Sequence, residues 1–485
     1  MRVTSPGPVR PRGRWLFVAG LALYEVLFAV FYPPTFAIVD EDAYLTQALL
    51  FRSGRLTYEN SGIPAPHMTV EHGGRLASKY PPGNSLLLVP FTLFGWRGVF
   101  ACGLVLSLLG TWLFLLALRR IVPGADESWA LLYLFYPVSV LFSRTVMSDL
   151  PAATAVLAAF VLLVRRRHLP AGLLLGLACL VRYSTAVLVP VFGVLVVFGA
   201  ARRWKSLGLF ALGLVPAGML AAGWNWHCYG GPLGFPMYLT GNFHPGYFLR
   251  NVAFYLPALF VLYPLMPVAP VLAGRKWRRH LVLPGLAVLL LYCFASYLPG
   301  HLGFPARELV GLRYLLPGIV FFVLGYAVVL ARFEAGHRWF RFARLAGLVL
   351  LAGLAAAVHL RHDRLLEEQA RYRDLVYEKV PPGALLVCDA EVSELVSFAW
   401  GRRDWIHFVE FGVPTPVDGR IAGRDTVYAA MMSPPGAEDD SERAMFLSLL
   451  ARHRERRIVL REEGPRRLEI YRLKPAGRAP VRAGG

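Results

Sequence analysis

Apolar runs of membrane-spanning length follow one another through the first three quarters of the chain. A helical span needs about 20 mostly apolar residues, and by this rule the chain contains about eleven crossings. The candidate runs are 15–32, 98–118, 128–144, 149–164, 169–181, 184–200, 206–226, 251–272, 281–298, 312–331 and 342–359. The pattern predicts an α-helical polytopic membrane protein.

Two long polar stretches lie outside these runs. The first, 33–97, separates the first two spans, and the second, 361–485, follows the last one. The second stretch alternates strand-like runs such as "ALLVCDA" and "TVYAAMM" with helix-like runs, which is typical of a small α/β domain. We therefore predict a tail at 1–14, a transmembrane domain at 15–360 that includes the loop 33–97, and an α/β domain at 361–485.

Charge indicates the orientation of the spans. If residues 1–14 are cytosolic, every predicted inner segment is basic, as cytoplasmic loops are. The short outer loops hold few cations, namely Arg144, Arg182, Arg250, Arg307 and Arg313. This topology predicts a plasma-membrane protein with a cytosolic N-terminus and an extracytoplasmic C-terminal domain.

Composition agrees with a membrane protein. The chain is 56% hydrophobic and 17% charged, whereas soluble domains are ~45–50% apolar and ~25% charged. The net charge of +20 comes from short clusters between apolar runs and not from one stripe, so we exclude nucleic acid as a partner. None of the five cysteines forms a C-x-x-C pair, and a bridge between Cys228 and Cys388 is the one pairing that the topology would allow.

An acidic triplet, Asp40, Glu41 and Asp42, directly follows the first span in "FAIVDEDAYLTQALL". The stretch predicts an amphipathic helix on the outer membrane surface, with Asp40 as its N-cap and Gly54 as its stop. The triplet either supplies catalytic carboxylates or simply favours the positive end of that helix.

Other polar residues recur at predicted outer ends of spans. Lys79 and Tyr80 precede Pro81 and Pro82, which predict an extended turn and no helix. A lysine at this depth can bind a lipid phosphate or only snorkel to the interface. Arg144 and Asp149 lie in a tight outer turn, where charges are costly, and could also form an ion pair. Further candidates at outer turns, each of which could instead be an interfacial anchor, are Arg182, Tyr183, Arg313, Tyr314 and His244.

These groups share one side of the membrane under a topology that was derived without them. Scarce cations beside carboxylates suit displacement of a phosphate from a sugar, since cations stabilise the leaving phosphate and a carboxylate takes the acceptor's proton. Nucleotide sugars are absent outside the cell, so a lipid-phosphate donor is expected.

The order of these motifs resembles the membrane glycosyltransferases of the GT-C fold, in the lipid-carrier-dependent branch that includes protein O-mannosyltransferases and aminoarabinose transferases. The resemblance covers about 1–331 and lies in Asp40-Glu41-Asp42, Lys79-Tyr80-Pro81-Pro82, Ser143-Arg144 with Asp149, Arg182-Tyr183, and Arg313-Tyr314 with Pro317. Two departures are one residue inserted in the lysine–proline motif and Arg182 in place of lysine.

The resemblance implies an inverting displacement from a polyprenyl-phosphate-linked sugar to a hydroxyl of a lipid, glycan or protein. It implies that Asp40 is the base, with Glu41 and Asp42 beside it. Lys79, Tyr80, Arg144, Arg182 and Arg313 would bind the donor phosphate. The substrate-binding residues would be Asp149, Tyr183, His244 and Tyr314. A divalent metal shared by Asp40 and Asp149 is allowed but not required.

Two other functions are compatible with a membrane protein of this composition. A transporter or flippase of a lipid-linked or small anionic substrate predicts ionisable groups near the bilayer midplane, where only Glu25 lies. A scaffold that displays the C-terminal domain would not need cations gathered in one cavity.

Overall fold

The computed structural model describes residues 13–59, 68–234, 242–299, 302–337, 339–396, 404–410, 413–414, 417, 421, 424–433, 441–453, 456–462 and 466–473. The chain divides into two compact units. The first unit takes Met1–Pro33 with Lys79–Asp363, and the second takes Pro34–Ser78 with Arg364–Gly485. The predicted loop 33–97 is therefore shared between the two units, with the division at Lys79.

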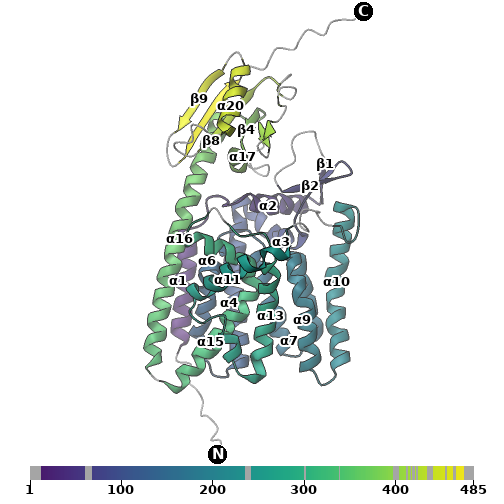
Figure 1. The fold of residues 1–485 in the computed structure, drawn as a ribbon, viewed down its shortest axis with the longest axis vertical. Coiled ribbons are helices and arrows are strands. Elements are labelled where there is room, and N and C mark those ends of the chain that lie inside the picture. The colour runs from purple at the N-terminus through teal and green to yellow at the C-terminus, as the bar shows by residue number, and fades with distance from the viewer. Residues whose placement is uncertain are drawn as a thin grey trace, which may run out of the picture. The chain divides into compact units, whose positions relative to one another are not determined.

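The first unit is helical, and its longer helices run side by side (Figure 1). Its α-helices are α1 (Arg14–Val30), α3 (Pro82–Leu88), α4 (Ala101–Ile121), α5 (Leu131–Leu134), α6 (Pro137–Ser143), α7 (Asp149–Val164), α8 (His168–Val181), α9 (Leu188–Gly199), α10 (Arg203–Tyr229), α11 (Phe248–Leu262), α12 (Ala269–Leu272), α13 (Arg275–Cys293), α14 (Ala306–Leu312), α15 (Leu316–Gly336) and the part of α16 (Phe340–Lys379) that precedes Arg364. Its 3-10 helices are η1 (Val89–Phe94), η2 (Trp96–Phe100), η3 (Glu127–Ala130), η4 (Tyr183–Val187), η6 (Pro245–Tyr247) and η7 (Arg313–Leu315).

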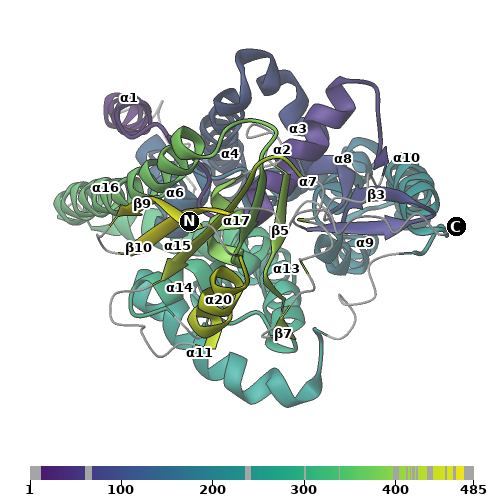
Figure 2. The same ribbon diagram turned by 90° about the horizontal axis from the view of Figure 1, so that it is seen from above.

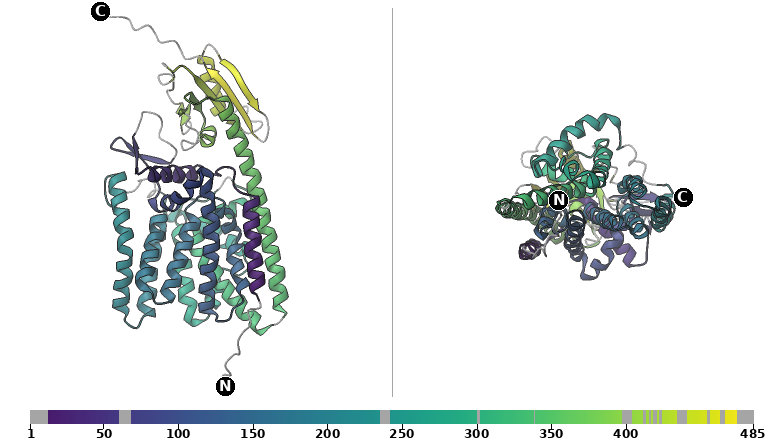
Figure 3. Two further views of the ribbon diagram at one scale, coloured as in Figure 1. Left: turned by 180° about the vertical axis from the view of Figure 1, so that it is seen from behind. Right: turned by 90° about the horizontal axis from the view of Figure 1, so that it is seen from below.

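Helices α7 and α15 form the interior of this unit. Most residues of both helices are buried, and Phe160 meets Phe321 edge to face with ring centroids 5.2 Å apart. An end-on view shows α8, α9 and α10 grouped together beside them (Figure 2). Views from behind and from below also show that the long helices of the first unit have roughly parallel axes (Figure 3). A helix that is apolar on all sides belongs in such an interior.

Among the described residues, four helical stretches are long and apolar enough to cross a membrane: Trp96–Ile121, Arg203–Tyr229, Ala306–Gly336 and Phe340–Lys379. Shorter apolar helices lie at Pro82–Phe94, Asp149–Val164, His168–Val181 and Tyr183–Gly199. These helices are compatible with a membrane location. The number of about eleven crossings and the orientation of the termini stay predictions.

Two predicted spans are not single helices, because prolines interrupt them. In 128–144, Tyr136 precedes Pro137 and has an extended ψ of 121°, so the helix restarts as α6. In 251–272, α11 ends at Leu262, and Tyr263 before Pro264 is extended, with ψ of 108°. Hydropathy alone did not reveal these breaks because the residues on both sides are apolar.

The second unit contains a five-stranded sheet with the strand order β5-β4-β8-β10-β9. β4 (Leu385–Cys388) pairs in parallel with β5 (Asp404–His407) and β8 (Val427–Ser433). β10 (Arg467–Leu473) is antiparallel to β8 and to β9 (Arg456–Glu462). The described residues of the C-terminal part also form the helices α17 (Ala390–Leu395) and α20 (Ser441–Arg452) and the short antiparallel pair β6 (Val409–Glu410) and β7 (Val413–Pro414).

Residues 34–78 belong to this second unit. They form α2 (Val39–Arg52) and a small antiparallel sheet of β1 (Tyr58–Glu59), β3 (Arg75–Ser78) and β2 (Thr69–His72). The end of α16 holds this segment, since Gln369 donates to the Ala37 carbonyl at 3.5 Å and Arg373 to the Pro34 carbonyl at 3.3 Å. All five cysteines are free, so the suggested bridge between Cys228 and Cys388 does not form.

Candidate functional site

Arg182 is the centre of a polar cluster in the first unit. It follows the last residue of α8 in an extended conformation, which ends the helix at Val181. Its Nη1 lies 2.9 Å from Asp149 Oδ1 and donates to Ser148 Oγ at 3.1 Å. Its other nitrogens donate to Tyr292 Oη at 3.1 Å and Ser184 Oγ at 3.2 Å. The planar guanidinium fork can make these contacts together, as an ammonium cannot.

Asp149 is the first residue of α7, and its side chain is 0% exposed. A buried carboxylate is costly unless it is paired, and Arg182 provides the pairing charge. The contact is an ion pair without hydrogen-bond geometry, and among the described residues neither Asp149 oxygen accepts a hydrogen bond. Asp149 therefore balances the charge of Arg182 inside the protein.

Three tyrosine rings stack beside this ion pair. Tyr314 stacks on both Tyr292 and Tyr297, with ring centroids 5.5 Å and 5.1 Å away, and the centroids of these two tyrosines are 6.4 Å apart. The Arg182 guanidinium is 5.4 Å from the Tyr314 ring centroid, and that of Arg313 is 4.6 Å from it. Arg313 also donates to Tyr314 Oη at 2.7 Å. Two cations thus contact the same aromatic ring, an arrangement that holds both side chains in defined positions.

The sequence predicted Asp149, Arg182, Arg313 and Tyr314 separately, and the structure brings them together. It adds Ser148, Ser184, Tyr292 and Tyr297, which the sequence analysis missed. Tyr292 and Tyr297 lie in the predicted span 281–298, where tyrosines are expected as part of an interfacial aromatic belt. Their signal was the recurrence of phenols in "YCFASY" at the predicted outer end of that span.

The segment with Lys79 and Tyr80 leads directly into α3. The predicted extended turn is wrong beyond Pro81, because Pro82 is the first residue of a helix, a position that tolerates proline. The Lys79 Nζ lies 5.1 Å from the Tyr80 ring centroid.

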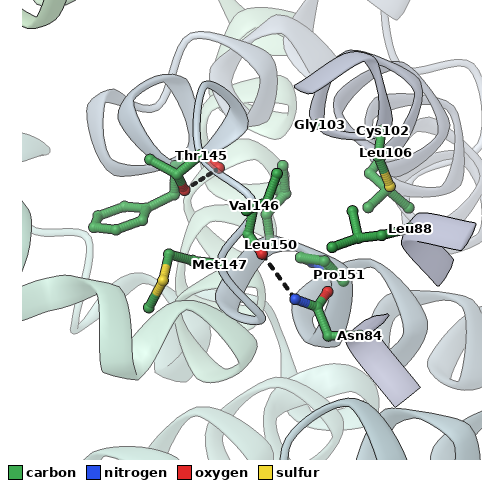
Figure 4. Close-up of a pocket in the computed structure, with 11 residues that line it drawn as sticks. Asn84, Leu88, Cys102, Gly103, Leu106, Thr145, Val146, Met147, Leu150 and Pro151 are labelled. Carbon is green, nitrogen blue, oxygen red and sulfur yellow. Dashed lines mark hydrogen bonds between the residues drawn. The ribbon is translucent and has the colours of Figure 1, made fainter. Parts of the chain in front are cut away.

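Two contacts fasten α3 to the turns that carry Asp149 and Arg182. A Cβ on Gly83 would lie 2.5 Å from the Leu180 carbonyl carbon, so only glycine allows this approach to the end of α8. Asn84 donates to the Val146 carbonyl at 2.8 Å, in the turn before Asp149, beside a small cavity (Figure 4). The motif that contains Lys79 is therefore anchored to both turns of the cluster.

Arg144 does not join this cluster. Its side chain is 0% exposed and pairs with Asp363 Oδ1 at 2.8 Å. The ion pair considered between Arg144 and Asp149 is thus wrong, since each residue has a different partner. The cause is tertiary: α16 brings an acid to Arg144, and α8 brings a cation to Asp149.

Two other predicted substrate-binding residues have separate surroundings. Tyr183 donates to Asn225 Oδ1 on α10 at 2.8 Å. His244 is exposed, and its Nδ1 accepts the Gly246 amide at 3.0 Å at the start of η6. In the part of the chain that the structure describes, neither of these hydrogen bonds involves the Arg182 cluster, and the substrate-binding roles of Tyr183 and His244 stay predictions.

The acidic triplet lies in the first turn of α2, in the second unit. The predicted N-cap is wrong, because the helix begins at Val39 and Asp40 is inside it. Glu41 is fully buried and accepts the Ala37 amide at 2.8 Å and the Ile38 amide at 3.2 Å. Asp42 is buried and accepts from Thr46 Oγ1 at 3.4 Å. Gly54 follows the helix with φ of 74°, as its predicted stop requires.

The described residues contain no group of three or more His, Cys, Asp or Glu side chains that could hold a metal ion. Asp40 and Asp149 belong to different units, and a metal shared by them stays a prediction.

The chain matches one protein family by sequence and several solved structures by fold. Residues 79–233 match the model of Glycosyltransferase family 87, a stretch that contains Lys79, Asp149 and Arg182. No curated protein matches the chain by sequence. The fold is similar to that of ArnT from Cupriavidus metallidurans in the apo state, with a TM-score of 0.64 and 14% identity, covering 94% of this chain and 98% of that one.

Two further structures are similar. ArnT from the same organism bound to undecaprenyl phosphate has a TM-score of 0.64 and 15% identity, covering 95% of this chain and 98% of that one. The apo oligosaccharyltransferase from Archaeoglobus fulgidus has a TM-score of 0.50 and 11% identity, covering 87% of this chain and 69% of that one. These likenesses confirm the resemblance to the GT-C fold membrane glycosyltransferases that the order of the motifs indicated.

Proposed function

We propose that this protein is a membrane glycosyltransferase that moves a sugar from a polyprenyl-phosphate donor to an acceptor hydroxyl at the outer face of the plasma membrane. The observation that carries the proposal is the Arg182 cluster, in which two arginines, a buried carboxylate and three stacked tyrosines meet. The family match over 79–233 and the ArnT fold with bound undecaprenyl phosphate support the same chemistry.

The reaction is an inverting single displacement. The acceptor oxygen attacks the anomeric carbon, the bond from that carbon to the phosphate oxygen breaks, and the polyprenyl phosphate leaves with the electron pair. Arg182 and Arg313 stabilise the charge on the leaving phosphate, a role that preorganised cations perform well in a dry site. Lys79 adds a further cation. Asp40 takes the proton of the acceptor hydroxyl as general base.

The remaining polar groups bind the sugar. We propose that Asp149 and Tyr314 contact sugar or acceptor hydroxyls, as the sequence predicts. Since Asp149 offsets one of the two arginine charges, the cluster retains about one net positive charge for a phosphate, and donor binding is expected to weaken as salt increases.

The proposal is tested in proteoliposomes that contain the purified protein, a set of short-chain polyprenyl-phosphate sugars and a candidate acceptor extract. Release of free polyprenyl phosphate together with a glycosylated product is expected for one donor. Movement of the intact lipid-linked sugar across the bilayer without cleavage would instead support the flippase alternative.

Lys79→Ala tests the phosphate contact. The variant should raise the KM for the donor several-fold and leave the KM for the acceptor unchanged, because the lysine acts only on the phosphate. Lys276→Ala, on the opposite end of the α13 helix from Tyr292, is the control. Equal losses for donor and acceptor would contradict the phosphate role.

A further inference from the structure

Arg144 is held by three contacts with α16. Its Nη1 lies 3.1 Å from His359 Nδ1 and donates to the His359 carbonyl at 3.2 Å, and its Nη2 donates to Asp363 Oδ1 at 2.8 Å. A guanidinium has donors only, so His359 Nδ1 accepts. His359 is therefore neutral, with its proton on Nε2. Its ring also stacks on Phe31 and meets Tyr24 edge to face, at centroid distances of 6.0 Å.

These contacts leave Arg144 unsuited to binding the donor phosphate. The side chain is fully buried, and Asp363 already balances its charge. A phosphate would have to displace Asp363 and leave that carboxylate without its cation. Breaking a buried pair in this way is strongly unfavourable.

The position of Arg144 in the chain indicates another role. Arg144 directly follows α6 and precedes the turn Thr145–Ser148, whose last residue accepts a hydrogen bond from Arg182 and precedes Asp149. α6 is also fixed at Ser143, because Tyr24 donates to Ser143 Oγ at 2.7 Å and the Ser143 carbonyl lies 1.8 Å from where a Cβ on Gly103 would be. Arg144 is thus the point at which α16 is attached to the segment that carries Asp149.

We propose that Arg144 is a positioning residue that, through Asp363 and His359, fixes the turn Thr145–Ser148 and so places Ser148 and Asp149 against Arg182. This inference rests on the proposed transferase function. It replaces the phosphate-binding role that the sequence suggested for Arg144.

A double-mutant cycle tests the inference. Arg144→Gln and Asp363→Asn should each lower kcat about tenfold and change the donor KM less than twofold, because both break the same attachment. The double variant should be no slower than either single one. A raised donor KM in Arg144→Gln with wild-type behaviour in Asp363→Asn would overturn the inference and restore the phosphate role.

Conservative variants provide a second test. Asn places an oxygen near the position of His359 Nδ1, so His359→Asn should retain most activity and His359→Leu should lose about as much as Asp363→Asn. Asp374→Asn, at an exposed site further along the same helix, is the matched control and should resemble the wild type. Similar losses in His359→Asn and His359→Leu would count against an accepting role for this ring.

A readout that needs no donor separates this inference from the proposed function. Hydrogen exchange should accelerate at the amides of Thr145–Ser148 in both Arg144→Gln and Asp363→Asn, while the amides of α7 and α15 keep their protection. Unchanged exchange in the turn, or equal acceleration throughout the unit, would overturn the positioning role. A wild-type protein without transfer activity would refute the transferase proposal and leave the exchange result standing.

Discussion

Adjacent carboxylates in α2 have different surroundings. Glu41 is fully buried and accepts two backbone amides that precede the helix, so it caps the helix from inside. Asp40, the preceding residue in the same helical turn, is only half-buried. Neighbouring residues on a helix point in different directions, so one acid can stabilise the element while the other meets a substrate. The helix-terminus reading therefore applies to Glu41, and a catalytic role for Asp40 stays a prediction.

Asp40→Asn should lower the transfer rate at least ~10²-fold, the usual effect of losing a general base. The thermal stability should change little, because the substitution keeps the size of the side chain. Glu41→Ala gives the opposite result: it should cost about 1 kcal/mol of stability, as the loss of a cap does, with a smaller effect on the rate. Transfer assays and thermal melts on both variants check the contrast, and undiminished transfer by Asp40→Asn would refute the assigned base.

Arg182→Lys keeps the charge but cannot reach Asp149, Ser148 and Tyr292 together. We expect kcat to fall about 10²-fold, within the range for one lost electrostatic contact to a transition state. Arg203→Lys, at an exposed position on α10, is the control. Equal activity of Arg182→Lys and the wild type would show that charge alone suffices and that the fork geometry is irrelevant.

The short helix α3 shows how one element places the motif before it. Pro81 and Pro82 predicted a turn, and the structure places a helix start there instead, because the first position of a helix needs no amide hydrogen. Gly83 lets α3 lie against the end of α8, and Asn84 ties it to the turn before Asp149. The conformation of the motif is therefore set by the neighbours of the helix as well as by its prolines.

Gly83→Ala should disturb the site without touching a substrate. The added Cβ would lie 2.5 Å from the Leu180 carbonyl carbon and must push α3 away. Overpacking of this kind costs about 1–3 kcal/mol, and the shift of Lys79 should raise the donor KM. Gly218→Ala, where a Cβ meets nothing within 4 Å on α10, should be neutral or slightly stabilising. Thermal melts and donor titrations of the two variants compare them, and equal behaviour would contradict the packing argument.

At the scale of the molecule, the chain forms two compact units, and each unit combines two segments that are far apart in the sequence. Residues 34–78 pack with the C-terminal part, and α16 contributes to both units. In the second unit Tyr372, Val376 and Val380 join Leu386 and Ile470 of the central sheet in one core. The acidic helix α2 thus belongs to the same unit as the C-terminal sheet, although more than 300 residues separate them.

The second unit should become less stable as the pH rises from about 4 to about 7. Burial raises the pKa of Asp389 from 3.8 to about 7, in spite of two backbone amides that favour its charged form. Burial, with Glu391 and Asp40 nearby, raises the pKa of Glu394 to about 7. The folded state binds protons in this interval that the unfolded state has lost, so its stability falls and then levels above pH 7.

The pH dependence of the melting temperature tests whether stability falls as the pH rises. The wild type should melt at lower temperature as the pH increases from 5 to 7, and Asp389→Asn should show a weaker dependence at a lower overall stability, because Asn cannot accept both amides. A melting temperature that rises over this interval would contradict the expected protonation of the folded state.

Hydropathy determined much of this protein without any structure. The apolar runs predicted most helices of the first unit, the strand-like runs "ALLVCDA" and "TVYAAMM" predicted β4 and β8, and the order of short motifs indicated the GT-C resemblance. Such features are local, because helix formation, span length and turn chemistry depend on neighbouring residues. The broken helices at 128–144 and 251–272 were missed only because apolar residues continue through the proline breaks.

The tertiary structure alone decided which charged side chains form ion pairs and which aromatic side chains pack beside them. Arg144 and Arg182 looked equivalent in the sequence, yet one is buried against Asp363 and the other joins Asp149 and the tyrosine stack. Partners more than 30 residues apart are chosen by how helices pack, and a charge in a dry interior takes whichever opposite charge that packing supplies. No local pattern contains this information, so the roles of these arginines could be assigned only from the folded chain.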